Sequence, residues 1–413
     1  MQIRLYQKIL KFRFRMAFKP VFKDRAGKAI RDCLLLSVFL VLPSFRMIFK
    51  YFPYPFLVSL LYTILFLTVC MTIHLCLNGK DHFHCRVLRW RMLSWMLAAC
   101  FAAVSFFIYP VADARKLSGM GSTGDDAVIE PAKTLLECGR LYDTVLYDGA
   151  PVSPGPGWII LNAPFALLHI YWLMNTVYII AAIIISRYYL EKCLPGNIVL
   201  VFLSVTLIFW ELLVTGHDMF AMGFSFCMLT LSVWSENRET APSASRIFLT
   251  GAVAGVISTA RVVFLGVPML LAVFLSKRHK RHAWIFLLTS LTVAGLLHGY
   301  FYAINTTYPP FHLFSTGKSM AGGGWSVIGL LMTALTVCIA YKRLDVSSGS
   351  WMMSVFICMA VPLSAVSLAQ LGQTGWRFAL WEGANYLAPA IPLLLFAKAA
   401  KMASIDAENT RIL

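Results

Sequence analysis

Long apolar runs separated by short polar or basic loops fill the chain from residue 33 to residue 400. A helix that crosses the hydrocarbon core of a membrane needs about 20 such residues, whereas a membrane β-strand shows about ten residues of alternating polarity. Helices also satisfy their own backbone hydrogen bonds in lipid. The pattern shows no soluble domain, sequence repeat or heptad. It therefore predicts an all-α, polytopic helical membrane protein.

The spacing of the runs predicts about twelve transmembrane segments with both termini on the cytoplasmic side. Ten segments are single apolar runs, at residues 33–49, 55–77, 92–111, 158–186, 198–214, 220–234, 284–304, 325–340, 351–371 and 386–400.

The run 247–276 is about 30 residues long, which exceeds the roughly 20 residues of one span. It lies between a polar loop and the basic loop 277–282, both assigned to the cytoplasm. Several glycines and Pro268 permit close packing and a break. We therefore expect a hairpin of two short helices, with Arg261 near its outer tip.

Positive charge sets this orientation and limits the choice of partners. Lys and Arg outnumber Asp and Glu by 36 to 19, and they concentrate in segment 1–31 and in loops. Such residues mark cytoplasmic loops and contact anionic lipid. We expect a basic cytoplasmic segment 1–31, a single transmembrane domain 32–400 and a cytoplasmic tail 401–413. The expected location is the cell inner (plasma) membrane, with membrane lipids and not nucleic acid as partners.

Cysteine and histidine residues do not form a metal-binding pattern. The ten cysteines lie mostly in apolar runs, without a Cys-x-x-Cys pair, and are typical of small core residues. His74, His82, His84 and Cys85 fall among arginines at the cytoplasmic end of a segment. The sequence shows no dense set of carboxylates. We therefore predict no metal-site residues and no cofactor, and we leave the metal requirement open.

One outer loop, residues 113–157, differs from the basic and apolar remainder of the chain. Its acidic, turn-rich stretch begins with the sequence GSTGDD, so that Asp125 and Asp126 directly follow a flexible turn and an outward segment. Long loops in compact proteins commonly carry function. The two carboxylates are placed where a base acting on a lipid-linked substrate would lie.

A short amphipathic helix is predicted behind the two aspartates. The apolar residues that share one helical face are Val128, Ala132, Leu135 and Leu136. Gly139 is a favourable helix end, and Pro131 indicates that the regular part of the helix begins near Pro131 itself. We expect this helix to lie on the membrane surface.

The order of these features resembles the first outer loop of the GT-C superfamily of polyprenyl-phosphate-sugar-dependent glycosyltransferases, such as bacterial mannosyl- and arabinosyl-type enzymes. The shared order is an outward helix, an acidic pair, a short amphipathic helix, a Gly-x-x-Tyr-Asp motif, a Pro/Gly turn and an inward helix. In this chain the motif lies at 139–143 and the turn at 149–157. The acidic pair of the family is usually Asp-Glu, whereas here it is Asp125-Asp126. Two extra helices precede the loop, and a soluble C-terminal domain has no counterpart.

Later parts of the chain extend the resemblance over about residues 92–400. The short second outer loop of the family is similar to Thr215-Gly216-His217-Asp218. Its small-residue helix hairpin is similar to the segment 251–255 with Arg261 and Pro268. Its C-terminal outer corner is similar to Arg377 with Asn385-Tyr386-Leu387-Ala388-Pro389.

The resemblance implies inverting transfer of a sugar from a polyprenyl-phosphate donor to a glycan or lipid acceptor on the outer face. Asp125 is the first candidate for the general base and Asp126 the second, since neighbouring carboxylates raise one another's pKa. Cations must offset the charge of the departing phosphate. The candidates are Arg261, Arg377, His217 and Lys318 for the phosphate, with Tyr142 and Tyr147 for stacking on the sugar.

Other interpretations stay open. His217 with Asp218 is also typical of a structural hydrogen-bonded pair, and surface tyrosines are typical of the aromatic belt. A transporter or flippase of a lipid-linked sugar would share the hydropathy but should show inverted repeats or broken helices in both halves. An O-antigen polymerase or ligase should instead depend on arginines in a large later outer loop.

Overall fold

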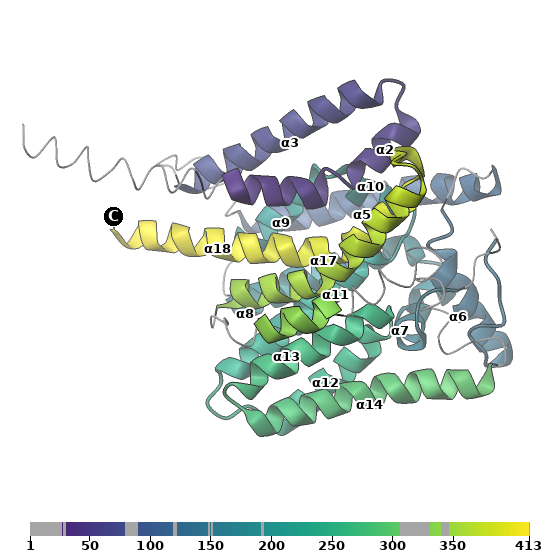
Figure 1. The fold of residues 1–413 in the computed structure, drawn as a ribbon, viewed down its shortest axis with the longest axis vertical. Helices are drawn as coiled ribbons and strands as arrows, with labels where there is room; N and C mark the ends of the chain where they lie inside the picture. Colours follow the sequence, from purple (N-terminus) through teal and green to yellow (C-terminus); the bar gives the residue numbers. More distant parts are fainter. Residues whose placement is uncertain are drawn as a thin grey trace, which may run out of the picture.

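The chain is helical throughout the part that the structure, a computed structural model, describes. The described residues are 27, 30–78, 90–118, 122–147, 149, 152–190, 194–305, 331–339 and 347–412, and no strand occurs among them. The C-terminal end of helix α18 (Ile391–Ile412) lies at one end of the bundle. Helix α6 (Asp126–Cys138) lies at the opposite end, which we call the loop end (Figure 1). The predicted site residue Lys318 and the histidines at 82 and 84 fall outside the described residues.

Six single helical stretches in the described part are long and apolar enough to cross a membrane. They are α3 (Pro55–Asn78), α5 (Arg91–Ala114), the stretch Tyr171–Leu190 that contains η2 (Tyr171–Leu173) and α8 (Met174–Leu190), α11 (Met219–Arg238), α14 (Lys280–Ile304) and α17 (Ser348–Gln373). Two further pairs qualify only when taken together. The helix Ile30–Leu40 meets α2 (Ser44–Tyr51) at 52°, and α9 (Leu194–Ser204) meets α10 (Leu207–Val214) at 84°. The described residues thus offer six to eight candidate spans, against the twelve or so expected.

Four expected segments are not among these spans: the two helices of 247–276 are too short, 325–340 lies partly outside the described residues, and 386–400 does not qualify. In addition, two of the predicted runs contain a turn. The predicted segment 158–186 is divided between α7 (Pro156–Leu167) and α8 by a turn in which His169 has φ 57°. The predicted segment 386–400 begins in the 3₁₀ stretch η5 (Glu382–Ala390) before α18. Hydropathy registers apolar residues but not a turn made among them, because the turn's polar groups belong to the backbone.

The hairpin expected over residues 247–276 is confirmed. It consists of α12 (Ala244–Ser258) and α13 (Gly266–Ser276), joined by Arg261 and the 3₁₀ turn η3 (Val262–Leu265). Both helices pack against α14. A Cβ atom added to Gly255 would lie 2.5 Å from the Ser290 carbonyl oxygen, so only glycine permits this backbone contact.

Side chains of α2 and α3 satisfy free backbone groups of the second bent helix pair. The N–H of Ile208 donates to the Ser44 hydroxyl (3.1 Å), and the N–H of Leu207 donates to the Tyr62 hydroxyl (3.2 Å). These N–H groups belong to the first turn of α10, where no helical acceptor is available. Side chains of α2 and α3 therefore stabilise a helix start that would be costly in lipid.

A buried ion-pair group joins α2 to two other elements. Arg46 of α2 is 5% exposed and forms ion pairs with Glu211 of α10 and with Glu382 at the start of η5 (2.7 Å). A buried arginine is stable only with such partners. The group therefore fixes α2, α10 and η5 relative to one another.

Helix α6 confirms the amphipathic helix predicted within residues 113–157. Its Ala127, Val128 and Ala132 are buried and Leu136 is 67% exposed, and it ends at Gly139 in the left-handed conformation (φ 72°). The predicted start near Pro131 was wrong, because α6 begins at Asp126 and contains Pro131. A proline within the second turn removes one helical hydrogen bond, which the burial of this face against α7 offsets.

Candidate functional site

Asp125 is a buried carboxyl group immediately before α6. It is 1% exposed. The Tyr109 hydroxyl, from the last turns of α5, donates a hydrogen bond to Oδ2 of Asp125 (2.7 Å). Its other oxygen, Oδ1, is buried and has no hydrogen-bond partner within the described residues. A buried carboxyl oxygen without a donor is costly and is positioned to accept a proton or a hydroxyl group.

The surroundings of Asp125 favour its protonated form. Burial, reinforced by the charges of Asp126 and Asp113, raises the pKa of Asp125 to about 7, against the opposing effects of the Tyr109 hydrogen bond and of Lys116. A general base is most effective when its pKa lies near the working pH. Asp125 therefore has the protonation behaviour of a base at neutral pH.

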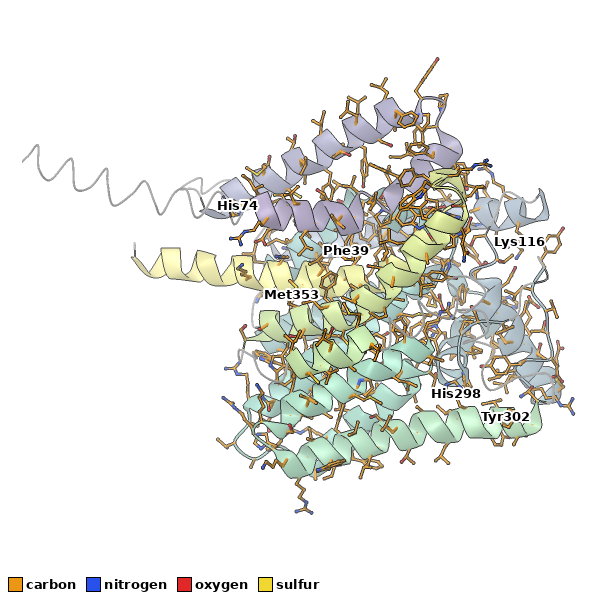
Figure 2. All side chains as sticks on the ribbon, viewed as in Figure 1. Phe39, His74, Lys116, His298, Tyr302 and Met353 are labelled. Atoms are coloured by element: carbon orange, nitrogen blue, oxygen red, sulfur yellow. The ribbon has the colours of Figure 1, made fainter. Side chains whose placement is uncertain are left out.

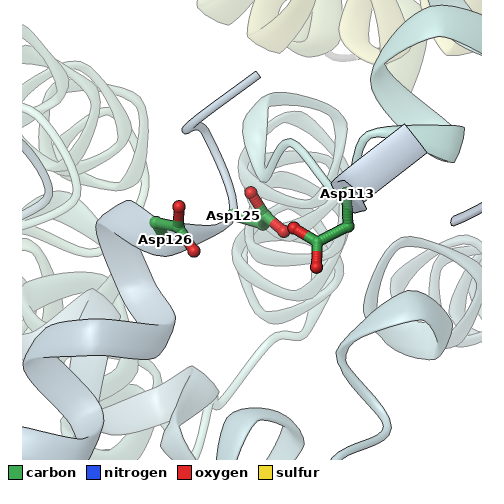
Figure 3. A group of neighbouring side chains, drawn as sticks. All are labelled: Asp113, Asp125 and Asp126. Carbon is green, nitrogen blue, oxygen red and sulfur yellow. The ribbon is translucent and has the colours of Figure 1, made fainter. Parts of the chain in front are cut away.

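Two more carboxylates and a lysine complete this cluster. Lys116 Nζ donates to Oδ1 of Asp126 (2.8 Å) and pairs with Oδ1 of Asp113 (2.7 Å). Figure 3 shows the Asp125 carboxyl between those of Asp113 and Asp126, and oxygen atoms of all three lie within 4.8 Å of one another. Hydrogen bonds to Asp113 and Asp126 raise the pKa of Lys116 although its burial, the largest single effect, lowers it. The lysine thus stays charged and neutralises Asp126, which separates the roles of the two neighbouring aspartates.

Sequence analysis missed Tyr109, Asp113 and Lys116 as site residues. They are spaced at i, i+4 and i+7 across the end of α5 and the turn η1 (Arg115–Ser118), so that they share one face. This spacing is the sequence signal that points them toward Asp125. Lys116 lies at the loop end and His74 lies at the other end of the molecule (Figure 2).

The corner 215–218 packs directly on Asp125. A Cβ atom added to Gly216 would lie 2.6 Å from the Tyr109 ring and 3.2 Å from Cβ of Asp125, and one added to Gly124 would lie 2.5 Å from the His217 ring. Gly216 also has φ 66°, which favours glycine. The two predicted outer loops are therefore in contact, as a shared site requires.

Asp218 is a second buried carboxylate beside this contact. It is 1% exposed and accepts hydrogen bonds from Trp158 Nε1 (2.8 Å) and, at 3.3 Å, from Nδ1 of His217. Its burial would raise the pKa, but the His217 hydrogen bond and the charge of Arg261 outweigh this effect and lower the pKa of Asp218. Asp218 is therefore a carboxylate at neutral pH. Its hydrogen bond with His217 agrees with the alternative interpretation of these two residues as a structural pair.

Arg261 brings a half-buried positive charge to the same region. It lowers the pKa of Asp218 and opposes the increase that burial gives to the pKa of Tyr386 in η5, so all three groups are electrostatic neighbours. Its guanidinium donates to the Ala260 carbonyl (3.3 Å). A guanidinium has five N–H donors, and most of them are left for a ligand among the contacts described.

The other predicted residues differ in their placement. Arg377 is exposed at the start of η4 (Phe378–Leu380). Tyr142 is 7% exposed and its hydroxyl donates to the Pro154 carbonyl (3.1 Å), so it joins two parts of the loop, and its stacking on a sugar stays a prediction. Tyr147 is 63% exposed on the loop surface. For Tyr147 and Arg377, the predicted roles stay predictions.

Comparison of the chain with protein families, with curated proteins and with solved structures gave no match. The functional interpretation therefore depends on the geometry of the site and on the resemblance in the order of motifs.

The pH dependence of activity should change when the Tyr109 hydrogen bond to Asp125 is removed. If ionised Asp125 is the base, the rate should fall below about pH 7, the pKa of this carboxyl. The Tyr109 hydrogen bond lowers that pKa, so Tyr109→Phe should raise it and move the acidic limb of the pH-rate profile to higher pH. Asp126→Asn removes a charge that raises the pKa and should move the limb to lower pH. Tyr188→Phe, which changes a 76% exposed tyrosine, is the control. Identical pH-rate profiles for all variants would show that the acidic limb does not report the ionisation of Asp125.

Alanine substitutions at two glycines with left-handed backbone distinguish backbone strain from displacement of the site residues. Alanine at Gly216 or Gly139 should each cost about 1–2 kcal/mol of stability, because a Cβ atom disfavours this conformation. An added Cβ at Gly139 meets nothing within 4 Å, whereas at Gly216 it displaces Tyr109 and Asp125. Thermal denaturation should therefore show the larger loss for Gly216→Ala, because the displaced side chains add to the backbone strain. Only Gly216→Ala should also lower turnover, by up to about 10²-fold. Equal turnover in both variants would contradict this contact.

Proposed function

We propose that the chain is an integral membrane glycosyltransferase of GT-C type. It moves a sugar from a polyprenyl-phosphate donor to a glycan or lipid acceptor on the outer face, with inversion. The observation that supports this most is Asp125. One of its oxygens is held by Tyr109, the other is buried without a partner, and its pKa is about 7. Its place between an apolar helix bundle and a polar loop suits an acceptor hydroxyl meeting a lipid-borne donor.

The proposed reaction uses the groups in the following way. Oδ1 of Asp125 takes the proton from the acceptor hydroxyl while the acceptor oxygen bonds to the anomeric carbon. The bond between that carbon and the phosphate oxygen breaks, and polyprenyl phosphate leaves with the electron pair. General-base assistance of this kind contributes about 10²–10⁴-fold. Arg261, adjacent to Asp218 and Tyr386, is the cation placed to bind the departing phosphate.

A deletion strain tests this proposal directly. Mass spectrometry of surface glycans and of lipid-linked sugars should show loss of one glycan and accumulation of one polyprenyl-phosphate sugar. Wild-type chain should restore both, whereas Asp125→Asn, produced at the same level, should not. The control is Glu137→Gln, which changes an exposed carboxylate on the same helix. Purified protein in liposomes should transfer the sugar so identified to its acceptor, and failure there would reject the proposal.

A flippase of lipid-linked sugars is the second candidate. The two bent helix pairs favour it, because discontinuous helices line the substrate path of many transporters. Both bends precede residue 215, however, and two free N–H groups at the second bend are already bonded to Ser44 and Tyr62. Liposomes distinguish the candidates, since a flippase moves the donor between leaflets without breaking its sugar-phosphate bond.

A further inference from the structure

Asp113, Asp125 and Asp126 have the spacing of a metal site, but a lysine of the same chain lies among them. A bound divalent cation contacts oxygen ligands at about 2.0–2.6 Å, so the oxygens around one ion lie within roughly 5 Å of one another. The three carboxylates meet this limit, with oxygens within 4.8 Å. Lys116 Nζ is 2.7 Å from Asp113 Oδ1 and 2.8 Å from Asp126 Oδ1.

Independent features indicate that this cluster is built to hold positive charge. Asp125 and Asp126 are 1% and 5% exposed, and Oδ1 of Asp125 is buried without a donor. Burying several carboxylates side by side is costly unless a cation or a proton neutralises them. Lys116 supplies one positive charge, and its side chain is only 20% exposed.

We propose that Lys116 is the resident cation of this carboxylate cluster. Its ammonium neutralises the buried carboxylates in place of a divalent ion. The ammonium pairs with Asp113 and Asp126 and leaves Oδ1 of Asp125 without a partner among the described residues. Without Lys116, the three carboxylates form a binding site for one divalent cation. The part of this proposal that concerns catalysis rests on the proposed function, whereas the part that concerns metal binding does not.

The first experiment measures Mn²⁺ binding by the purified full-length chain in nanodiscs at pH 7.5, through the electron paramagnetic resonance signal of free Mn²⁺. Lys116→Met should bind one Mn²⁺ about tenfold or more tightly than wild type, because the ion no longer competes with a tethered ammonium at about millimolar effective concentration. The double variant Lys116→Met, Asp126→Asn should lose this binding. Lys116→Arg keeps the cation and should behave as wild type.

The matched control is Lys133→Met, which removes an exposed lysine paired with Glu130 on α6. It should bind Mn²⁺ no better than wild type. Size-exclusion profiles and thermal denaturation confirm that each variant is folded, and if Lys116→Met is not, Lys116→Gln replaces it. Folded Lys116→Met, or Lys116→Gln in its place, with wild-type Mn²⁺ affinity overturns the proposal. So does tight Mn²⁺ binding by wild type that Asp126→Asn abolishes.

A second experiment examines turnover. Sugar transfer by wild type should be unchanged in EDTA, whereas Lys116→Met should be inactive in EDTA and regain activity with Mn²⁺. Wild-type activity that requires Mn²⁺ overturns the proposal. If no variant transfers sugar under any condition, the proposed function fails, while the Mn²⁺ measurement still decides the role of Lys116.

Discussion

Replacing Asp125 by asparagine is expected to lower the rate of sugar transfer by about 10²–10⁴-fold, the range of general-base contributions. Asparagine has nearly the same shape and can still accept the hydrogen bond from Tyr109 through its amide oxygen. It cannot take a proton from the acceptor. The loss should therefore appear in kcat, with the affinity for donor little changed, as expected for an interaction made in the transition state. Single-turnover measurements with saturating donor separate the two constants.

The neighbouring carboxylate provides the decisive comparison. Lys116 keeps Asp126 paired at 2.8 Å, so Asp126→Asn should retain more activity than Asp125→Asn. Glu137→Gln, on the exposed side of the same helix, should match wild type. If Asp126→Asn abolished transfer and Asp125→Asn did not, the base would be Asp126 and the separation of roles would be wrong.

Replacing Arg46 by methionine is expected to destabilise the protein by about 3–5 kcal/mol, because it leaves a buried carboxylate without its partner. The side chains of Arg46 and Glu211 are 7% and 9% exposed. Thermal denaturation in detergent, followed by size-exclusion chromatography, measures the loss as a lower midpoint. Restoring neutrality with Arg46→Met, Glu211→Gln should recover part of it.

Glu382 supplies the matched control for Arg46. Its side chain is 59% exposed, so its ion pair with Arg46 is screened by solvent. Glu382→Gln should therefore cost about 1 kcal/mol or less. Equal midpoints for Arg46→Met and Glu382→Gln would show that Arg46 does not depend on Glu211.

Local signals in the sequence predicted the helical class, the hairpin around Arg261, the end of α6 at Gly139 and the pair Asp125-Asp126. Each depends on residues within one or two helical turns, where hydropathy, glycine and charge act directly. The start of α6 was misplaced because the rule for proline does not include burial of the helix face against α7.

These local signals did not predict contacts between residues that are distant in the sequence. The partners of Arg46 are 165 and 336 residues away, and the N–H groups of α10 find their acceptors on α2 and α3. Hydropathy also counted apolar runs as single crossings where such contacts stabilise a bend. The Tyr109 hydrogen bond to Asp125 spans only 16 residues, but it depends on the chain returning from the loop to the end of α5.

The ion pair between Arg46 and Glu211 has a consequence for biosynthesis. Glu211 is synthesised 165 residues after Arg46, which corresponds to roughly 10–30 s at a translation rate of about 5–20 residues per second. An unpaired arginine in a membrane helix costs up to about 2.5–3.5 kcal/mol during insertion, the value for the helix centre. The first bent helix pair therefore enters the membrane before its charge is neutralised. The ion pair that fixes α2 against α10 therefore forms only after α10 has been synthesised.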